Sequence, residues 1–189
     1  MIKTKNDLKE YLFADKIALG RKKKKPHFFD KIWRFQIALR HSEYYTNNRG
    51  GIFNKILKLF WYYNFKRLSL ELGFSIPLNV CGKGLSIPHY GTIIINPKTK
   101  IGDFCRIHCS TNIGASAGKK EAPQIGNNCY IGPGAILFGD ITIANNTTIG
   151  ANATVNSSFQ EENVVIVGTP ARIVKREMPN WLEFNKVSM

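Results

Sequence analysis

A six-residue period runs through the second half of this 189-residue chain. Every sixth residue from position 95 is Ile, Leu or Val with one exception, the set being Ile95, Ile101, Ile107, Ile113, Lys119, Ile125, Ile131, Leu137, Ile143, Ile149 and Val155. A second column of small or β-branched residues follows four places after most of these aliphatic residues. Two columns that keep one phase over residues 95–155 indicate an internal structural repeat.

A period of six fits neither an α-helix, which turns every 3.6 residues, nor a flat sheet, which shows a period of two. It suits a solenoid of short strands with three faces and about 18 residues per coil, in which the repeated aliphatic side chain points to the axis. Gly and Asn then occupy corners, where they tolerate unusual backbone angles. Residues 18 apart should stack, which predicts the pairs Ile95 over Ile113, Ile107 over Ile125, and Ile131 over Ile149.

The repeat fails at Lys119, which takes an aliphatic position within the polar segment 115–123. This segment contains Gly118 and Pro123 and cannot pack along the axis. We predict a loop that leaves the solenoid, a common place for function. An insertion without a function is the alternative.

Residues 1–72 show helical periodicity instead of the repeat. Three apolar faces predict three helices: Leu8, Tyr11 and Leu12; Ile32, Phe35 and Leu39; and Ile52, Phe53, Ile56, Leu57 and Phe60. Breaks are expected at 20–26 and 46–51. We therefore predict a helical cap over 1–72, a solenoid over 73–176, and a docking tail over 177–189, where Trp181, Leu182 and Phe184 gather.

The net charge of +14 belongs mostly to the cap, which holds 17 basic and 6 acidic side chains. Arg21–Lys25 is a run of five cations, but no nucleic-acid reader motif accompanies it, so no nucleic-acid partner is predicted. Peripheral contact of the basic cap with an anionic membrane is one interpretation, and a solvated cap docked on the solenoid is the other. Without a secretory signal or a long apolar run, we expect a cytoplasmic protein, at the inner face of the membrane if the cap contacts lipid.

The cysteines are Cys81, Cys105, Cys109 and Cys129, and they lack CxxC spacing. Their place within apolar repeats predicts small buried thiols in a reducing compartment, and no metal site.

Histidine is the natural candidate for chemistry in a chain without nucleotide-binding or metal motifs. His27 and His41 lie in the cap and are predicted to be structural or solvated. His89 lies beside the predicted corner at Gly91, where an imidazole could act as a general base or be a satisfied structural side chain. His108 follows an aliphatic position, so it should point outward and could contact a substrate.

Three segments, 86–96, 131–140 and 167–174, carry a resemblance to a known family. Over residues 74–176 the chain resembles the hexapeptide-repeat acyltransferases, most closely the serine O-acetyltransferase branch and its polysaccharide-cluster relatives. The resemblance implies a mainly β fold, a left-handed parallel β-helix preceded by the small basic α-helical cap. It also implies acetyl-CoA as cosubstrate, and a homotrimer with composite sites between subunits.

The resemblance assigns roles to individual residues. His89 would be the general base, and Tyr90, Asn96 and His108 would lie near the acceptor. Small residues would line the groove for the extended arm of acetyl-CoA, namely Gly114, Ala115, Gly134, Ala135, Gly150 and Ala151. Thr169, Arg172 and Lys175 would meet its nucleotide end and phosphates.

The acceptor is predicted from three positions at which this sequence departs from the serine acetyltransferases. Phe74, Pro88 and Ala122 stand where the serine enzymes carry Asp, Asp and His, so paired charges for an amino acid are missing. We predict O-acetylation of a small hydroxyl acceptor, a sugar or surface-polysaccharide precursor. The alternatives are a serine O-acetyltransferase of cysteine biosynthesis and a non-enzymatic structural or interaction solenoid. A zinc carbonic anhydrase of this fold is disfavoured because the chain lacks its paired histidine spacing.

Overall fold

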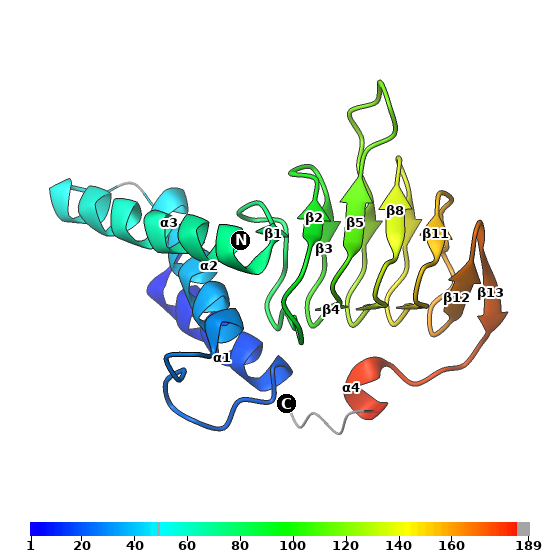
Figure 1. The fold of residues 1–189 in the computed structure, drawn as a ribbon, viewed down its shortest axis with the longest axis horizontal. Coiled ribbons are helices and arrows are strands. Elements are labelled where there is room, and N and C mark those ends of the chain that lie inside the picture. The colour runs from blue at the N-terminus through cyan, green and yellow to red at the C-terminus, as the bar shows by residue number, and fades with distance from the viewer. Residues whose placement is uncertain (49, 185–189) are drawn as a thin grey trace.

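The computed structural model describes residues 1–48 and 50–184 and consists of a helical cap, a β-solenoid and a short C-terminal helix (Figure 1). The helices are α1 (Lys5–Ala18), α2 (Lys31–Asn47), α3 (Ile52–Leu72) and α4 (Trp181–Phe184). The strands are β1 (Phe74–Ser75), β2 (Ile93–Ile95), β3 (Lys100–Ile101), β4 (Arg106–Ile107), β5 (Thr111–Gly114), β6 (Gln124–Ile125), β7 (Tyr130–Ile131), β8 (Ile136–Phe138), β9 (Thr142–Ile143), β10 (Thr148–Ile149), β11 (Thr154–Val155), β12 (Val165–Gly168) and β13 (Ala171–Lys175). Among the described residues no helix has the length and hydropathy needed to cross a membrane.

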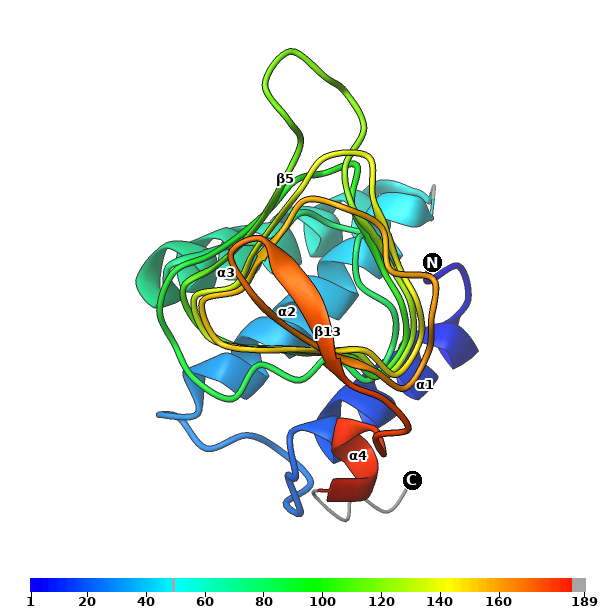
Figure 2. The same ribbon diagram turned by 90° about the vertical axis from the view of Figure 1, so that its right-hand side faces the viewer.

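The strands form three parallel sheets that wrap one axis, as the view along that axis shows (Figure 2). Sheet A has the order β1-β2-β5-β8-β11, sheet B the order β3-β6-β9, and sheet C contains β4-β7-β10-β12. Strand β13 turns back antiparallel to β12 and ends sheet C. The predicted parallel β-helix is therefore confirmed.

The repeated aliphatic side chains make one continuous core along the axis. All ten are 5% exposed or less, and several, including Ile107, Ile131 and Val155, are fully buried. Burial of each such side chain stabilises the folded state by about 1.5–3 kcal/mol relative to its exposure to water. Thr111 and Thr147 enter this core because their hydroxyls donate to the carbonyls of His108 and Ala144, each at 2.8 Å.

The loop at 115–123 changes the spacing of stacked residues. The predicted pairs at a spacing of 18 are present before and after it, with Ile95 on Ile113 and Ile131 on Ile149. The predicted pair Ile107 over Ile125 is wrong, since Ile107 stacks on Ile131, 24 residues on. The coil that contains the loop needs the extra residues because the loop projects from the solenoid and does not contribute to its walls (Figure 1).

The cap packs on the first coil through α2 and the second half of α3. Phe35 and Leu39 of α2 are fully buried, as predicted, and Phe35 meets Phe74 edge-on at 5.0 Å between ring centroids. In α3 the predicted packing face is wrong. Its buried residues are Phe65, Leu68 and Leu72, because the first turns of α3 project beyond α2 and leave their apolar side chains exposed.

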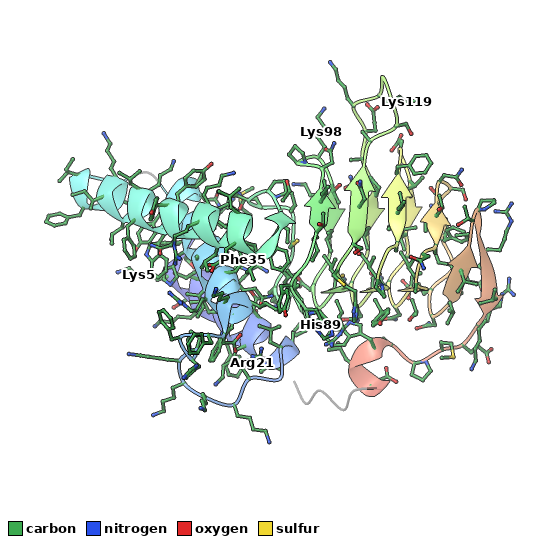
Figure 3. The ribbon with its side chains drawn as sticks, in the orientation of Figure 1. Lys5, Arg21, Phe35, His89, Lys98 and Lys119 are labelled. Carbon is green, nitrogen blue, oxygen red and sulfur yellow. The ribbon has the colours of Figure 1, made fainter. Side chains whose placement is uncertain are left out.

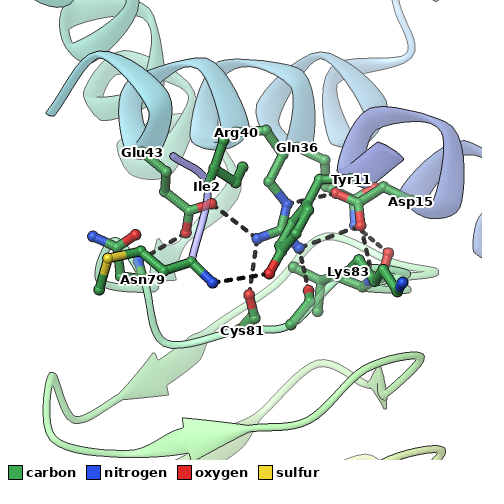
Figure 4. Close-up of polar contacts among 12 residues, drawn as sticks. Ile2, Tyr11, Asp15, Gln36, Arg40, Glu43, Asn79, Cys81 and Lys83 are labelled. Carbon is green, nitrogen blue, oxygen red and sulfur yellow. Dashed lines mark hydrogen bonds and ion pairs between the residues drawn. The ribbon is translucent and has the colours of Figure 1, made fainter. Parts of the chain in front are cut away.

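One buried ion cluster joins the cap to the solenoid (Figure 4). The fully buried Arg40 of α2 pairs with Asp15 of α1 at 2.8 Å and with Glu43 at 3.0 Å. Its guanidinium also donates to the carbonyl oxygens of Cys81 and Gly82 in the first coil. Burial opposes the charge, but the two carboxylates outweigh it and raise the pKa of Arg40 above its ordinary value.

The cysteines are all free, and Cys81, Cys105 and Cys129 are buried as predicted, while Cys109 is half-buried. Burial raises the pKa of the Cys81 thiol to about 12, so this sulfur stays protonated.

The C-terminal tail returns to the cap side of the solenoid. Trp181 and Leu182 of α4 are buried beside Ala18 of α1, and the Trp181 indole donates to the carbonyl of Phe104 at 2.8 Å. The side chain of Phe184 and residues 185–189 of the predicted tail lie outside the described residues.

The substitution Arg40→Met should destabilise the fold by about 3–5 kcal/mol, because it leaves the carboxylates of Asp15 and Glu43 buried without a cationic partner. Urea unfolding monitored by circular dichroism measures this loss. The matched control is Arg176→Met, which removes the exposed pair with Glu161 and should cost less than about 1 kcal/mol. Equal effects of the two substitutions would contradict the assigned role of Arg40.

Candidate active site

His89 lies on an open edge of the solenoid, where sheet C gives way to sheet A (Figure 3). Ser86 bridges to Arg106 at the end of sheet C, and β2 of sheet A begins at Ile93, so the turn between them carries His89. The His89 side chain is exposed, and the ring of His108 from the next coil is 6.0 Å away between centroids. The structure thus brings the two predicted histidines together.

The two histidines have different environments. The His108 ring packs 4.9 Å from the Tyr130 ring, and its Nε2 is buried without a hydrogen-bond partner in the described part of the chain. Burial, and then the nearby Arg106 and His89, lower the pKa of His108 to about 4. His108 is therefore neutral near pH 7 and offers an imidazole nitrogen for a hydrogen bond, next to the more accessible His89.

Arg106 and Tyr130 lie beside His108, and neither is among the site residues predicted from the sequence. They are direct neighbours in the sheet C ladder. Arg106 donates to the Ser86 hydroxyl at 3.1 Å and lies 5.3 Å from the Trp181 ring. Both residues directly precede a core isoleucine in the repeat, and this alternation was a signal that they face outward.

A cavity of about 440 Å³ lies next to Tyr90, which is 75% exposed. The loop between α1 and α2 forms its other wall, with Arg21, Lys31 and Asp30 among the lining side chains. Both signs of charge therefore border the space beside the His89 turn. Residues from the cap come to this place only through the tertiary fold.

Asn96, Gly114 and Ala115 lie on a different edge from His89. Asn96 follows β2, Gly114 ends β5 and Ala115 follows it, whereas His89 and His108 precede these strands of sheet A. The Asn96 side chain accepts from the backbone of Lys98 at 2.9 Å, which holds its own turn. Within one chain, the structure does not bring these three predicted residues to His89.

The predicted small residues are small for different structural reasons. A Cβ on Gly134 would lie 2.1 Å from the Asn152 side chain, and one on Gly150 would lie 2.6 Å from Val167. Coil packing alone therefore requires both glycines. At Gly114 the nearest atom to an added Cβ is 3.6 Å away, so the space there is not filled by this chain.

The remaining predicted cofactor residues divide between the core and the surface. Ala135 is fully buried, so the prediction that its side chain lines an outer groove is not supported. Ala151 is exposed at a corner, and the Thr169 hydroxyl donates to the carbonyl of Asn152 on the edge that begins at His89. Arg172 and Lys175 are exposed on β13 at the far end of the solenoid.

The three positions that depart from the serine enzymes are buried or half-buried as well as apolar in type. Phe74 is 4% exposed, Ala122 is 2% exposed, and Pro88 is half-buried. Across residues 1–48 and 50–184, neither His89 nor His108 forms an ion pair with a carboxylate. The same residues contain no cluster of three or more His, Cys, Asp or Glu side chains placed to hold a metal ion.

Residues 122–157 match the family model described as bacterial transferase hexapeptide (six repeats). The serine acetyltransferase of Staphylococcus xylosus is 37% identical over 98 residues, which cover 51% of this chain and 45% of that protein. The serine acetyltransferase of Synechococcus elongatus is 31% identical over 97 residues, or 50% of this chain and 39% of that protein. The match therefore spans less than half the length of these curated relatives.

Solved structures show the same fold. A serine acetyltransferase from Brucella abortus in complex with coenzyme A has a TM-score of 0.70 at 22% identity, covering 93% of this chain and 70% of that one. The Neisseria gonorrhoeae serine acetyltransferase gives 0.69 at 22% identity, covering 94% and 70%. The fold is a left-handed parallel β-helix. The predicted resemblance to the hexapeptide-repeat acyltransferases, with serine acetyltransferases as relatives, is confirmed.

We expect the imidazole of His108 to titrate with a midpoint near pH 4, so that it stays neutral at neutral pH. Histidine-selective NMR over a pH series measures this midpoint. Arg106→Gln should raise it, because a neighbouring positive charge disfavours the imidazolium. The control Arg172→Gln, at the far end of the solenoid, should leave it unchanged. A wild-type midpoint above about 6 would show that the ring is not desolvated.

Proposed function

We propose that this chain is an acetyl-CoA-dependent O-acetyltransferase with His89 as its general base. The observation that carries the proposal is the pair of histidines on one open edge, with an accessible His89 ring 6.0 Å from a neutral His108. The identity to proteins named serine acetyltransferase supports the same reaction class. A purely structural solenoid would have no use for a buried, unpartnered imidazole nitrogen beside a second, exposed histidine.

In the reaction, the acceptor hydroxyl loses its proton and the thioester carbon–sulfur bond is replaced by an ester carbon–oxygen bond. His89 takes the proton from the acceptor hydroxyl as its oxygen attacks the thioester carbonyl, because an alcohol is a weak nucleophile near pH 7. The carbon–sulfur bond then breaks, and the departing thiolate of coenzyme A takes the proton from His89. A backbone N–H of a neighbouring coil would stabilise the intermediate oxyanion, and the neutral ring of His108 would lie beside the acceptor.

Acetyl-CoA would lie along the outside of the solenoid with its phosphates at the far end. Arg172 and Lys175 are exposed there on β13, and their charge suits phosphate groups. The unfilled space at Gly114 would admit the extended arm, since no side chain of this chain occupies it. A neighbour with this fold was solved in complex with coenzyme A, which supports the assignment of the cosubstrate.

A homotrimer would complete the site. The edge with Asn96 and Gly114 is separated from the His89 edge by the width of sheet A, so a neighbouring subunit would have to bring the two together. The outer face of sheet A exposes Ile94 and Ile136, at 43% and 44%, which favours burial against such a neighbour. Sedimentation equilibrium tests this assembly.

For the acceptor, the comparisons support the serine O-acetyltransferase alternative better than the sugar predicted from sequence. The relatives reported above are all named serine acetyltransferase. The cavity beside Tyr90 is bordered by charges of both signs, but Arg21 pairs with Asp30 at 2.8 Å and Lys31 pairs with Glu71, so L-serine would have to exchange these partners for its own carboxylate and ammonium group. We nevertheless put L-serine first. A neutral hydroxyl acceptor such as a sugar is the second candidate, favoured by the buried apolar residues Phe74 and Ala122.

His89→Ala should lower acetyl-CoA turnover by about 10²–10⁴-fold, because the acceptor hydroxyl loses its general base. Binding of coenzyme A, measured by calorimetry, should be unchanged because the substitution leaves the groove intact. The matched control is His41→Gln, a histidine of α2 that stacks on Trp61 and does not line the cavity beside Tyr90, which should keep turnover within about threefold. Near wild-type turnover by His89→Ala would disprove the role of this residue.

L-Serine should be acetylated faster than its N-acetyl and methyl ester derivatives by about tenfold or more, which corresponds to about 1.4 kcal/mol per lost ion pair. The derivatives keep the hydroxyl but lack the ammonium or the carboxylate. Coenzyme A release, monitored with a thiol reagent, measures the rates beside a panel of neutral sugars. Efficient acetylation of a sugar with no preference for intact L-serine would establish the second candidate instead.

A further inference from the structure

One side of α3 exposes an apolar stripe that nothing in the described chain covers. The stripe consists of Ile52, Ile56, Leu59, Tyr63 and Leu70, which are 67%, 57%, 71%, 64% and 85% exposed. Their spacing of four, three, four and seven residues places them on one face of the helix. That face is opposite the buried side formed by Phe65, Leu68 and Leu72. A helix with only one packed side would ordinarily present polar residues to water.

The charges beside the stripe have a single sign. Lys55, Lys58 and Lys66 border it, and the chain has no Asp or Glu between Glu43 and Glu71. Among the described residues, no carboxylate lies within 4.0 Å of any of these three ammonium groups. The surface is therefore apolar along its centre and cationic along its border.

The apolar surface continues from the stripe onto the solenoid. A groove of about 520 Å³ lies between the second half of α3 and the first coil. Tyr62, Lys66 and Leu70 line it on the helix side, and Pro77 and Pro97 line it on the solenoid side. Leu70 belongs to both the stripe and the groove, so the two form one surface.

We propose that the stripe of α3 docks on an anionic lipid bilayer, lying in the plane of the interface. Leucine, isoleucine and aromatic side chains would enter the boundary between headgroups and acyl chains, while the lysines meet anionic headgroups. Tyr62 and Tyr63 suit this position because a phenol has an apolar ring and a polar end. Membrane contact of the basic cap was one of two interpretations of the sequence, and the structure points to α3 within that cap because its lysines border a continuous apolar face.

Charge disfavours the alternative in which two copies of the stripe cover each other. A symmetric pairing would place Lys55, Lys58 and Lys66 of one copy near the same lysines of the other. With no carboxylate in 44–70 to neutralise them, like charges would meet in a desolvated interface. An anionic bilayer has the complementary charge and needs no second apolar helix.

Cosedimentation of the full chain with vesicles tests the proposal. Binding to vesicles of phosphatidylcholine and phosphatidylglycerol should exceed binding to phosphatidylcholine alone and should weaken with added salt. Leu59→Glu should lower the partition coefficient by about tenfold or more, because a leucine that would enter the bilayer is replaced by a charged side chain. Lys55→Gln with Lys58→Gln should lower it by about tenfold on the anionic vesicles only. The matched control is Phe13→Glu, which changes an apolar residue of α1 that is 62% exposed and should leave binding unchanged.

The result that overturns the proposal is equal binding of the wild type and Leu59→Glu, or no binding of the wild type to anionic vesicles. If the wild type fails to bind and Leu59→Glu lowers the mass in sedimentation equilibrium, the stripe is an interface between copies of the chain. The measurement contains no acetyl-CoA and no acceptor, so its outcome is independent of the proposed acetyl transfer.

Discussion

Axial stacking of aliphatic side chains is the constraint on which the rest of this structure depends. Each strand has only two to five residues, so no strand is stable alone, and each coil is held by the coil before and after it. Ile95, Ile113 and Leu137 stack directly through the parallel register of sheet A. A shift of one residue would move a polar side chain into the core, so the corners of successive coils are forced to align.

The alignment of corners also brings the two histidines of the candidate site together. His89 and His108 come from different coils, yet they meet because the same corner recurs at each turn of the solenoid. The loop at 115–123 can leave the wall without disturbing this order, since Ile107 takes Ile131 as its partner in place of Ile125. Function can thus be added at corners while the axis continues unchanged.

The cap is oriented by a charge that would be costly to bury alone. Arg40 is acceptable in the interior because Asp15, Glu43 and two carbonyl oxygens of the first coil surround it. This geometry directs the loop between α1 and α2 toward Tyr90, where its charged residues border a cavity. The first turns of α3 project beyond α2 and leave their apolar side chains exposed.

Local sequence was enough to predict the parts of this protein that depend on a regular period. The six-residue repeat predicted the solenoid, its aliphatic core, the loop at Lys119, and the outward direction of His108, because alternation between core and surface is a local property of the chain. The three helices were also predictable from their spacing. Which face of α3 would be buried was not, since apolar residues occupy most of the circumference of its first turns, interrupted by Lys55 and Lys58, and the position of α2 decides which side is covered.

Only the tertiary structure decided which predicted site residues meet. It separated Asn96 and Gly114 from His89, because a strand of sheet A spans the distance between two corners. It also placed Ala135 in the core, lowered the pKa of His108 by burial, and brought Arg21 and Lys31 next to Tyr90 from more than fifty residues away. These outcomes depend on desolvation and on contacts between distant segments, and neither can be predicted from the local sequence.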